Sequence, residues 1–193
     1  MNYLAHAYLS FYNPPLLAGQ MISDFVKGKQ QYTYHEAIQK GIRLHRAIDA
    51  FTDAHPATHA AIAVFKPHVG RYAGAFVDIA YDYFLANDVR VFPSSNHLAT
   101  FATDTYALIA QEQSALPSNF VHLFGYMQSQ NWLYNYRLHE GIEKSFAGLT
   151  RRAQFLDTHL AVFDSFLEHQ QVLQQCYNVF VDDVRQFVQQ FLQ

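Results

Sequence analysis

Cysteine is almost absent from this chain. Its 193 residues include one cysteine, Cys176, which excludes an internal disulfide and a zinc site built from cysteines. Disulfides belong to oxidising compartments, so their absence favours a reducing one. The first residues show no basic segment followed by a long apolar one, and are therefore not expected to form a signal peptide. The sequence predicts a cytoplasmic protein.

The chain also lacks a strong charge of one sign and a long apolar run. Its formal net charge is -3, which argues against a protein that binds nucleic acid through a basic surface. No apolar run approaches the roughly 18 residues that a membrane span needs, so no membrane association is expected. Phosphate-binding loops of the GxxxxGK[ST] or GxGxxG type and the GxSxG nucleophile elbow are missing too.

Proline and glycine are scarce, with six and eight residues, and they lie at plausible boundaries between elements. Between them, apolar residues recur every three to four positions, which is typical of helices. Half of the residues are hydrophobic, enough for one sizeable core. We predict a single all-α domain over residues 1–193, a helical bundle. The expected helices cover about 2–12, 16–27, 33–53, 56–67, 70–87, 96–112, 118–129, 132–137, 139–148 and 150–192, the last broken near 169–171.

Local capping signals set three of these boundaries. Gly28 is expected to end the helix over 16–27, because glycine readily adopts the left-handed conformation found after a helix. Thr33 and Glu36 have the spacing of a capping box, which predicts the start of the next helix. Thr150 is expected to cap the C-terminal helical stretch.

The first candidate site is a row of residues at four-residue spacing: His45, Asp49 and Asp53. Residues at this spacing share one face of a helix. Histidine is the commonest metal ligand, and carboxylates suit Mn²⁺ or Mg²⁺. The alternative is a solvated helix face that carries ordinary surface charges.

A second row is formed by Asp78 and Asp82, in a predicted helix that is apolar almost all round and is therefore expected to be buried. Two buried carboxylates one turn apart repel each other and are costly unless a cation pairs with them. A divalent cation is one such partner, and a cation that holds a water molecule is a hydrolytic centre. The alternative is that each aspartate caps a helix or pairs with an arginine.

Three further features belong to this site in the same interpretation. Asp24 is predicted near a helix C-terminus, where the dipole disfavours a carboxylate, so metal ligation would explain its position. His6 lies in an apolar stretch and is either a ligand or a hydrogen-bonded core residue. Residues 25–48 carry five basic side chains and one acid, and such a positive field suits an anionic substrate or an acidic partner, unless it is only a soluble face. The basic residues are Lys27, Lys29, Lys40, Arg43 and Arg46.

Together these blocks resemble the bacterial acyl carrier protein phosphodiesterases, which are similar to HD-domain phosphohydrolases. The resemblance runs through almost the whole length, although residues 90–125 contribute little to it. It is carried by the order and spacing of MNYLAH at 1–6, Gly19, DFVKG at 24–28, Gly41-Ile42, HRAID at 45–49, Thr52-Asp53, Asp78-Ile79, Asp82, Phe84-Leu85, Trp132-Leu133, Tyr136-Arg137 and Arg151-Arg152.

The resemblance implies an HD-like fold and a hydrolase that uses a divalent metal, typically Mn²⁺, with Mg²⁺ and Fe²⁺ as alternatives. Such enzymes remove 4′-phosphopantetheine from a serine of holo-acyl carrier protein. The implied metal-site residues are Asp24, His45, Asp49, Asp78, Asp82 and His6, with Asp53 less certain. The implied catalytic residues are Asp24, His45, Arg46, Asp49 and Asp82, where Arg46 binds the phosphate and Asp49 or Asp82 orients water or acts as base. The acidic carrier protein would dock on Lys27, Lys29, Lys40 and Arg43.

Two other functions stay open at this point. The same metal site in an HD-like phosphohydrolase would serve a nucleotide or another small phosphate ester. A helical module without catalysis would bind an acidic partner and need no metal. A homodimer is a further expectation, through the aromatic C-terminal residues Phe180, Phe187 and Phe191.

Overall fold

The chain folds into helices, as the apolar spacing predicts. The computed structural model describes residues 1–153, 156 and 160–193, and every regular element within them is helical. The α-helices are α1 (Tyr3–Tyr8), α2 (Pro14–Ile22), α3 (Glu36–Ala54), α4 (Pro56–Val69), α5 (Ala73–Ala86), α6 (Ser95–Gln111), α7 (Ser118–Ser129), α8 (Trp132–Asn135), α9 (His139–Arg152), α10 (Leu160–Glu168) and α11 (Gln170–Leu192). Short 3₁₀ helices are η1 (Ser23–Phe25), η2 (Gly28–Thr33), η3 (Gly70–Tyr72) and η4 (Gln113–Ala115). The all-α prediction is confirmed.

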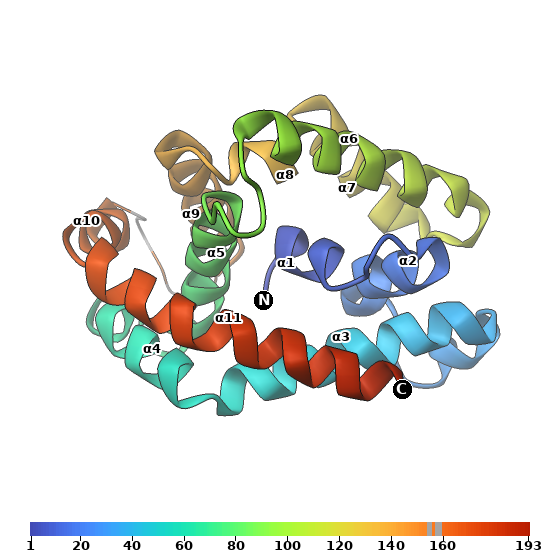
Figure 1. Cartoon of the computed structure of the whole chain (residues 1–193), viewed down its shortest axis with the longest axis horizontal. Coiled ribbons are helices and arrows are strands. Elements are labelled where there is room, and N and C mark those ends of the chain that lie inside the picture. The colour runs from blue at the N-terminus through green and yellow to red at the C-terminus, as the bar shows by residue number, and fades with distance from the viewer. Residues whose placement is uncertain (154–155, 157–159) are drawn as a thin grey trace.

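The short helix α1 lies in the middle of the molecule, and the N-terminus lies there too (Figure 1). It packs against α2 and α5. Helix α3 packs against α2, α4 and α11, and Figure 1 shows α3 and α11 along one side of the molecule while α6 and α7 lie along the other. Side chains from α1, α3 and α5, which are far apart in the sequence, therefore meet around the N-terminus.

The buried hydrophobic side chains of the described residues form one continuous core. Helix α5 is almost wholly inside it: Phe76, Val77 and Tyr81 have no exposed surface. Burial of aromatic and aliphatic side chains is the main favourable term in folding. The prediction that α5 is a buried helix is confirmed, and its Asp82 is buried completely.

Helices α2 and α3 touch through their backbones at two glycines. A Cβ atom added to Gly19 would collide with the carbonyl oxygen of Ile38 and would lie 2.8 Å from the Cα of Gly41. A Cβ on Gly41 would likewise collide with the carbonyl oxygen of Leu16. Only glycine allows so close an approach, which fixes α2, and the side chains that it carries, against the middle of α3.

Replacing Gly19 by alanine is therefore expected to force α2 and α3 apart. Overpacking of this kind costs about 1–3 kcal/mol or more, so we expect the free energy of unfolding, measured by urea denaturation, to fall by about 3 kcal/mol. Gly125→Ala is the control, because Gly125 lies in α7 and a Cβ there meets nothing within 4 Å. That control should be neutral or stabilising, and equal losses in both variants would contradict the close-contact argument.

The three boundaries predicted from capping signals are wrong. Helix α2 ends at Ile22, the chain continues in η1, and Gly28, with φ of +53°, begins η2. Thr33 does not cap α3, because its hydroxyl donates to the carbonyl of Gln30; the imidazole of His35 accepts from the Ala37 N–H instead. Thr150 lies inside α9, which continues to Arg152. The helix predicted over 2–12 is also shorter, since α1 ends at Tyr8.

The predicted break near 169–171 is confirmed, since α10 ends at Glu168 and α11 begins at Gln170. Phe180 is fully buried and belongs to the core, so it does not form part of an outer face. Phe187 is partly buried and stacks on Phe51 of α3 with ring centroids 4.6 Å apart, and Phe191 is exposed. A homodimer stays a prediction. Within the described residues, no helix is both long and apolar enough to cross a membrane.

Candidate functional site

Two histidines and one aspartate converge beside the N-terminus of α1. The ring of His6, from α1, stacks on the ring of His45, from α3, with centroids 4.0 Å apart and planes at 13°. Asp49, one turn after His45, places Oδ1 3.3 Å from His6 Nε2 and Oδ2 3.0 Å from His45 Nε2. The three residues thus bring one nitrogen or oxygen each to a single point, and they are a potential metal-binding group.

Three of the buried polar atoms in this group lack a hydrogen-bond partner. His6 Nε2, His45 Nε2 and Asp49 Oδ1 are buried, and none of them makes a hydrogen bond of good geometry with a described residue. Buried polar atoms without a partner are rare and costly, and a bound cation would satisfy all three. One ligand atom from each residue lies within 4.8 Å of the other two. The donor set of two imidazoles and a carboxylate also suits a divalent transition metal.

Electrostatics couples the three residues tightly. Burial by itself would lower the pKa of His45, but Asp24 and Asp49 outweigh burial and raise it to about 9. Burial, together with the charge of His45, lowers the pKa of His6. Burial would raise the pKa of Asp49, but His45 and His6 bring it well below its usual range. A cation at this point would take the place of the proton on His45, because ligating imidazoles must be unprotonated.

Asp24 joins this group from the 3₁₀ turn η1 and not from the end of a helix. Its Oδ1 lies 3.3 Å from His45 Nε2, and 72% of its side chain is exposed. The contact with His45 lowers the pKa of Asp24, so it is a carboxylate at the open side of the site. Asp53, the third member of the predicted row, is exposed, and its carboxylate is not among the converging ligand atoms.

Asp78 is paired with a different cation. The α-ammonium group of Met1 lies 2.8 Å from Asp78 Oδ1 and 3.5 Å from Asp49 Oδ1. Burial would lower the pKa of this ammonium group, but Asp78 and Asp49 outweigh burial and raise it. Asp78 therefore borders the His6–His45–Asp49 group through a shared ion pair, and its carboxylate is not among the converging ligand atoms.

Asp82 has a structural role in this fold. Its Oδ2 accepts from the Leu4 N–H at 2.8 Å and its Oδ1 from the Ala5 N–H at 3.1 Å. Both donors belong to the first turn of α1, where N–H groups have no partner inside the helix. Asn2, which precedes α1, makes no side-chain cap bond, so Asp82 caps α1 from another helix. The sequence left open whether Asp82 is a metal ligand or a helix cap. The structure shows the helix cap, and its carboxylate is not among the converging ligand atoms.

The predicted cationic residues lie on the η1–α3 side of the molecule, and most of them have partners within the chain. Arg46 donates to Gln31 Oε1 at 3.0 Å and to the carbonyl of Val26 at 2.9 Å. Arg43 pairs with Glu36 at 2.6 Å, and Lys40 donates to the carbonyl of Leu192 at 3.2 Å. Lys27 and Lys29, beside η2, are exposed. Arg46 thus ties α3 to the η1–η2 segment that carries Asp24.

Comparison with known proteins identifies the family. The family model described as acyl carrier protein phosphodiesterase matches residues 1–184. The chain belongs to this family. Among its relatives, the acyl carrier protein phosphodiesterase of Enterobacter sp. (strain 638) is 30% identical over 86% of this chain and 91% of the relative. That of Serratia proteamaculans is 32% identical over 79% of each chain. No solved structure matches the chain significantly.

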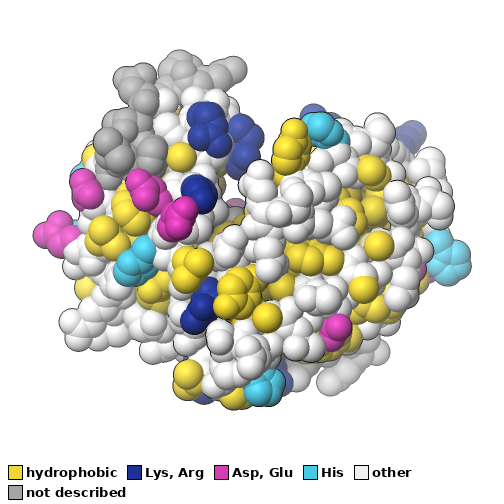
Figure 2. Space-filling view, turned by 90° about the horizontal axis from the view of Figure 1, so that it is seen from above, with side chains coloured by type: hydrophobic (Ala, Val, Ile, Leu, Met, Phe, Trp, Pro, Cys, Tyr) yellow, Lys and Arg dark blue, Asp and Glu magenta, His cyan; other side chains and the backbone are white. Residues whose placement is uncertain are grey.

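Two groups of residues near the His6–His45–Asp49 group were not predicted from the sequence. Gln20 and Ser10 are buried polar residues that hydrogen-bond to His6; the signal for Gln20 is a single amide in a stretch of α2 that is otherwise apolar. Tyr3 is the other: burial raises its pKa to about 12, Asp24 adds to this rise, and Arg152 opposes it. The charges of Asp24 and Arg152 therefore both act on the Tyr3 hydroxyl. Figure 2 shows several Lys and Arg side chains close together at one place on the face that it views.

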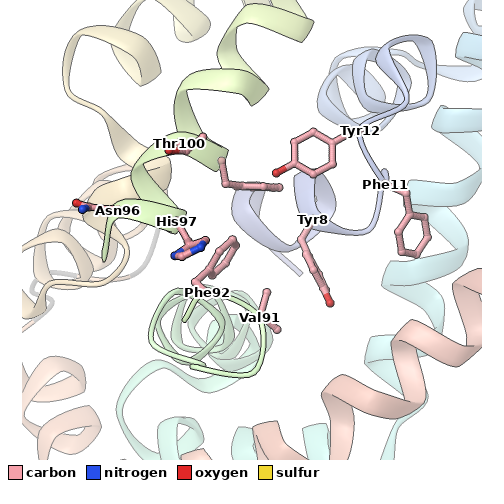
Figure 3. A pocket seen from close by; sticks show the side chains of 9 residues that line it. Tyr8, Phe11, Tyr12, Val91, Phe92, Asn96, His97 and Thr100 are labelled. Atoms are coloured by element: carbon pink, nitrogen blue, oxygen red, sulfur yellow. The ribbon is translucent and has the colours of Figure 1, made fainter. Parts of the chain in front are cut away.

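A separate aromatic cavity of about 380 Å³ lies between the turn after α1, the loop before α6 and α6 itself. Tyr8, Tyr12, Phe92 and His97 are among the residues that line it (Figure 3). Phe11 and Tyr12 adopt positive φ angles of 48° and 56°, which is strained for large side chains. Both rings are partly exposed and line the cavity.

Proposed function

We propose that this chain hydrolyses the phosphodiester bond between 4′-phosphopantetheine and a serine of holo-acyl carrier protein. The observation that carries the proposal is the convergence of His6, His45 and Asp49 in a chain of the acyl carrier protein phosphodiesterase family. We further propose that these three residues hold a divalent cation, Mn²⁺ in the first instance. When bound, such a cation polarises the phosphoryl oxygens and lowers the pKa of a water molecule.

The chain's own residues then have distinct tasks. His6 and His45 present their Nε2 lone pairs, and Asp49 presents its carboxylate, to one point. Asp24, at the open side, is placed to accept a hydrogen bond from the attacking water and so to orient it. The water oxygen loses a proton and forms a bond to phosphorus, the bond between phosphorus and the serine oxygen breaks, and the serine oxygen takes up a proton. The products are apo-acyl carrier protein and 4′-phosphopantetheine.

The phosphate contact is assigned to Arg46 in this proposal. Arg46 keeps N–H donors beyond the two that contact Gln31 and Val26, since a guanidinium has five. Its positive charge would offset the repulsion between the phosphodiester and the carboxylates of Asp24 and Asp49.

The decisive experiment uses the purified full chain with holo-acyl carrier protein and Mn²⁺. Intact-mass spectrometry of the carrier protein should show the loss of one 4′-phosphopantetheine, and chelation by EDTA should stop it. A panel of nucleotides and small phosphate esters is run beside it. Turnover of the small esters alone would refute the substrate, and binding of the carrier protein without turnover would favour a non-catalytic module.

Docking of the acidic carrier protein is proposed on Lys27 and Lys29, two predicted cations that are exposed at the start of η2. Exposed charge pairs contribute up to about 1 kcal/mol each, so the double variant Lys27→Glu/Lys29→Glu should raise the KM for holo-carrier protein about tenfold. Hydrolysis of a small phosphodiester should not change. Lys66→Glu on α4 is the matched control, and an equal effect of that control would contradict this docking surface.

A further inference from the structure

A closed set of buried hydrogen bonds surrounds the histidine that α1 contributes to the site. His6 Nδ1 lies 2.9 Å from Gln20 Oε1, and Gln20 Nε2 donates to the carbonyl of His6 at 3.0 Å and to Ser10 Oγ at 2.8 Å. Ser10 Oγ donates to the same His6 carbonyl at 2.8 Å. His6, Ser10 and Gln20 are each at most 2% exposed, so water does not compete for these bonds.

This arrangement allows one placement of hydrogens. A backbone carbonyl only accepts, so the atom of Gln20 that faces the His6 carbonyl must be the amide nitrogen. The other end of the amide is then Oε1, which also only accepts. Its partner, His6 Nδ1, must therefore carry a hydrogen. In a neutral imidazole the other nitrogen, Nε2, then holds the lone pair.

The Nε2 atom is the one that faces the rest of the site. It lies 3.3 Å from Asp49 Oδ1 and has no hydrogen-bond partner among the described residues. With the opposite tautomer, Nε2 would present a hydrogen to the point where the ligand atoms converge and could not bind a cation. The Gly19–Gly41 contact, next to Gln20 in the sequence, holds α2 at the position that this amide needs.

We propose that Gln20 is a positioning residue for the metal site: its amide holds His6 in the Nδ1–H tautomer and directs the Nε2 lone pair toward His45 and Asp49. The inference rests on the proposed metal site. Carboxylates and backbone carbonyls often fix ligating histidines in this way, and loss of such a partner costs about 10–100-fold in metal affinity. Here the partner of the imidazole is the side-chain amide of Gln20. The backbone carbonyl of His6 in turn orients this amide by accepting a hydrogen bond from it.

The first test needs no metal. Long-range ¹H–¹⁵N correlation spectra of the metal-free protein report the tautomer of each imidazole, and His6→Gln identifies the His6 signals among the eleven histidines. We expect a protonated Nδ1 and an unprotonated Nε2 on His6. An Nε2–H tautomer, or an equal mixture of the two, would overturn the inference.

The second test measures Mn²⁺ binding by titration calorimetry. Gln20→Leu should weaken binding about 10–100-fold and should give His6 a mixture of tautomers. Gln174→Leu, on α11, is the matched control and should bind as the wild type does. If Gln20→Leu does not fold, Ser10→Ala removes one support of the amide and should cause a smaller loss. If folded Gln20→Leu keeps both the His6 tautomer and the Mn²⁺ affinity of the wild type, this inference alone is refuted. If the wild type binds Mn²⁺ but does not hydrolyse holo-carrier protein, the proposed function alone is refuted.

Discussion

The Asp49→Asn variant is expected to lose nearly all hydrolysis of holo-acyl carrier protein. Asp49 is the residue that contacts both histidines, at 3.3 Å from His6 Nε2 and 3.0 Å from His45 Nε2. Asparagine keeps the shape, but it removes the negative charge and replaces one ligand oxygen by an NH₂ group. Because loss of an indirect partner already costs 10–100-fold in metal affinity, loss of a direct ligand should weaken Mn²⁺ binding by more than about 100-fold. Calorimetric titration and the mass-spectrometric assay measure the two losses.

Asp53→Asn is the informative control for this variant. Asp53 follows Asp49 by one helical turn and has the same residue type, but it is exposed and outside the converging group. We expect its metal affinity and turnover to stay close to those of the wild type. Equal losses in both variants would mean that the whole row takes part in the site, and would contradict the geometry described for Asp49.

Replacing Asp82 by alanine is expected to produce the largest loss of stability of any single aspartate. The change leaves the N–H groups of Leu4 and Ala5 buried without an acceptor. Each unsatisfied buried group costs about 1–3 kcal/mol, so the free energy of unfolding should fall by about 3 kcal/mol or more. Urea denaturation followed by circular dichroism measures this change. Asp104→Ala, an exposed aspartate on α6, should change stability by less than about 0.5 kcal/mol.

The stability of the wild type should also depend on pH through Asp82. Burial raises the pKa of Asp82 to about 7, although the Leu4 and Ala5 N–H groups partly oppose this rise. The folded state therefore binds this proton more tightly than the unfolded state, in which an aspartate has a pKa of about 3.9. The resulting stabilisation is complete below about pH 4 and is lost as the pH rises through about 7. Asp82→Asn does not titrate. The free energy of unfolding of the wild type should therefore fall, relative to that of Asp82→Asn, as the pH rises from about 4 through about 7. A constant difference would contradict the raised pKa.

Local signals in the sequence were sufficient for most of the helices and for half of the site. Helix spacing depends on residues three or four apart, and the pairing of His45 with Asp49 needs only one turn of α3, so both follow from neighbours in the chain. The prediction that α5 is buried follows from its apolar surface for the same reason. Helix ends were less predictable. Thr33 has the residue type of a cap, but its hydroxyl bonds to Gln30 and His35 caps α3 instead, and Thr150 lies inside α9.

The role of Asp82 shows where a pattern of residues is ambiguous. A buried carboxylate needs a positive partner, and the sequence alone does not distinguish a cation from the N-terminus of a helix, because both offer a positive charge or partial charge. In the fold the partner is the first turn of α1, which lies 77 and 78 positions away in the sequence. Asp78 and Asp82 thus share a face of α5 but serve different groups.

The sequence by itself determined that this chain is helical, that His45 and Asp49 share a face of one helix, and which family the chain resembles. The tertiary structure decided that His6 meets His45 and Asp49, that Asp24 contacts His45 from a 3₁₀ turn, that Asp53 stays outside, and that Gln20 hydrogen-bonds to His6. The physical reason is range. Periodicity acts over a single turn, whereas the contact of α1 with α2, α3 and α5 depends on a backbone approach at Gly19 and Gly41 and on a carboxylate that caps another helix.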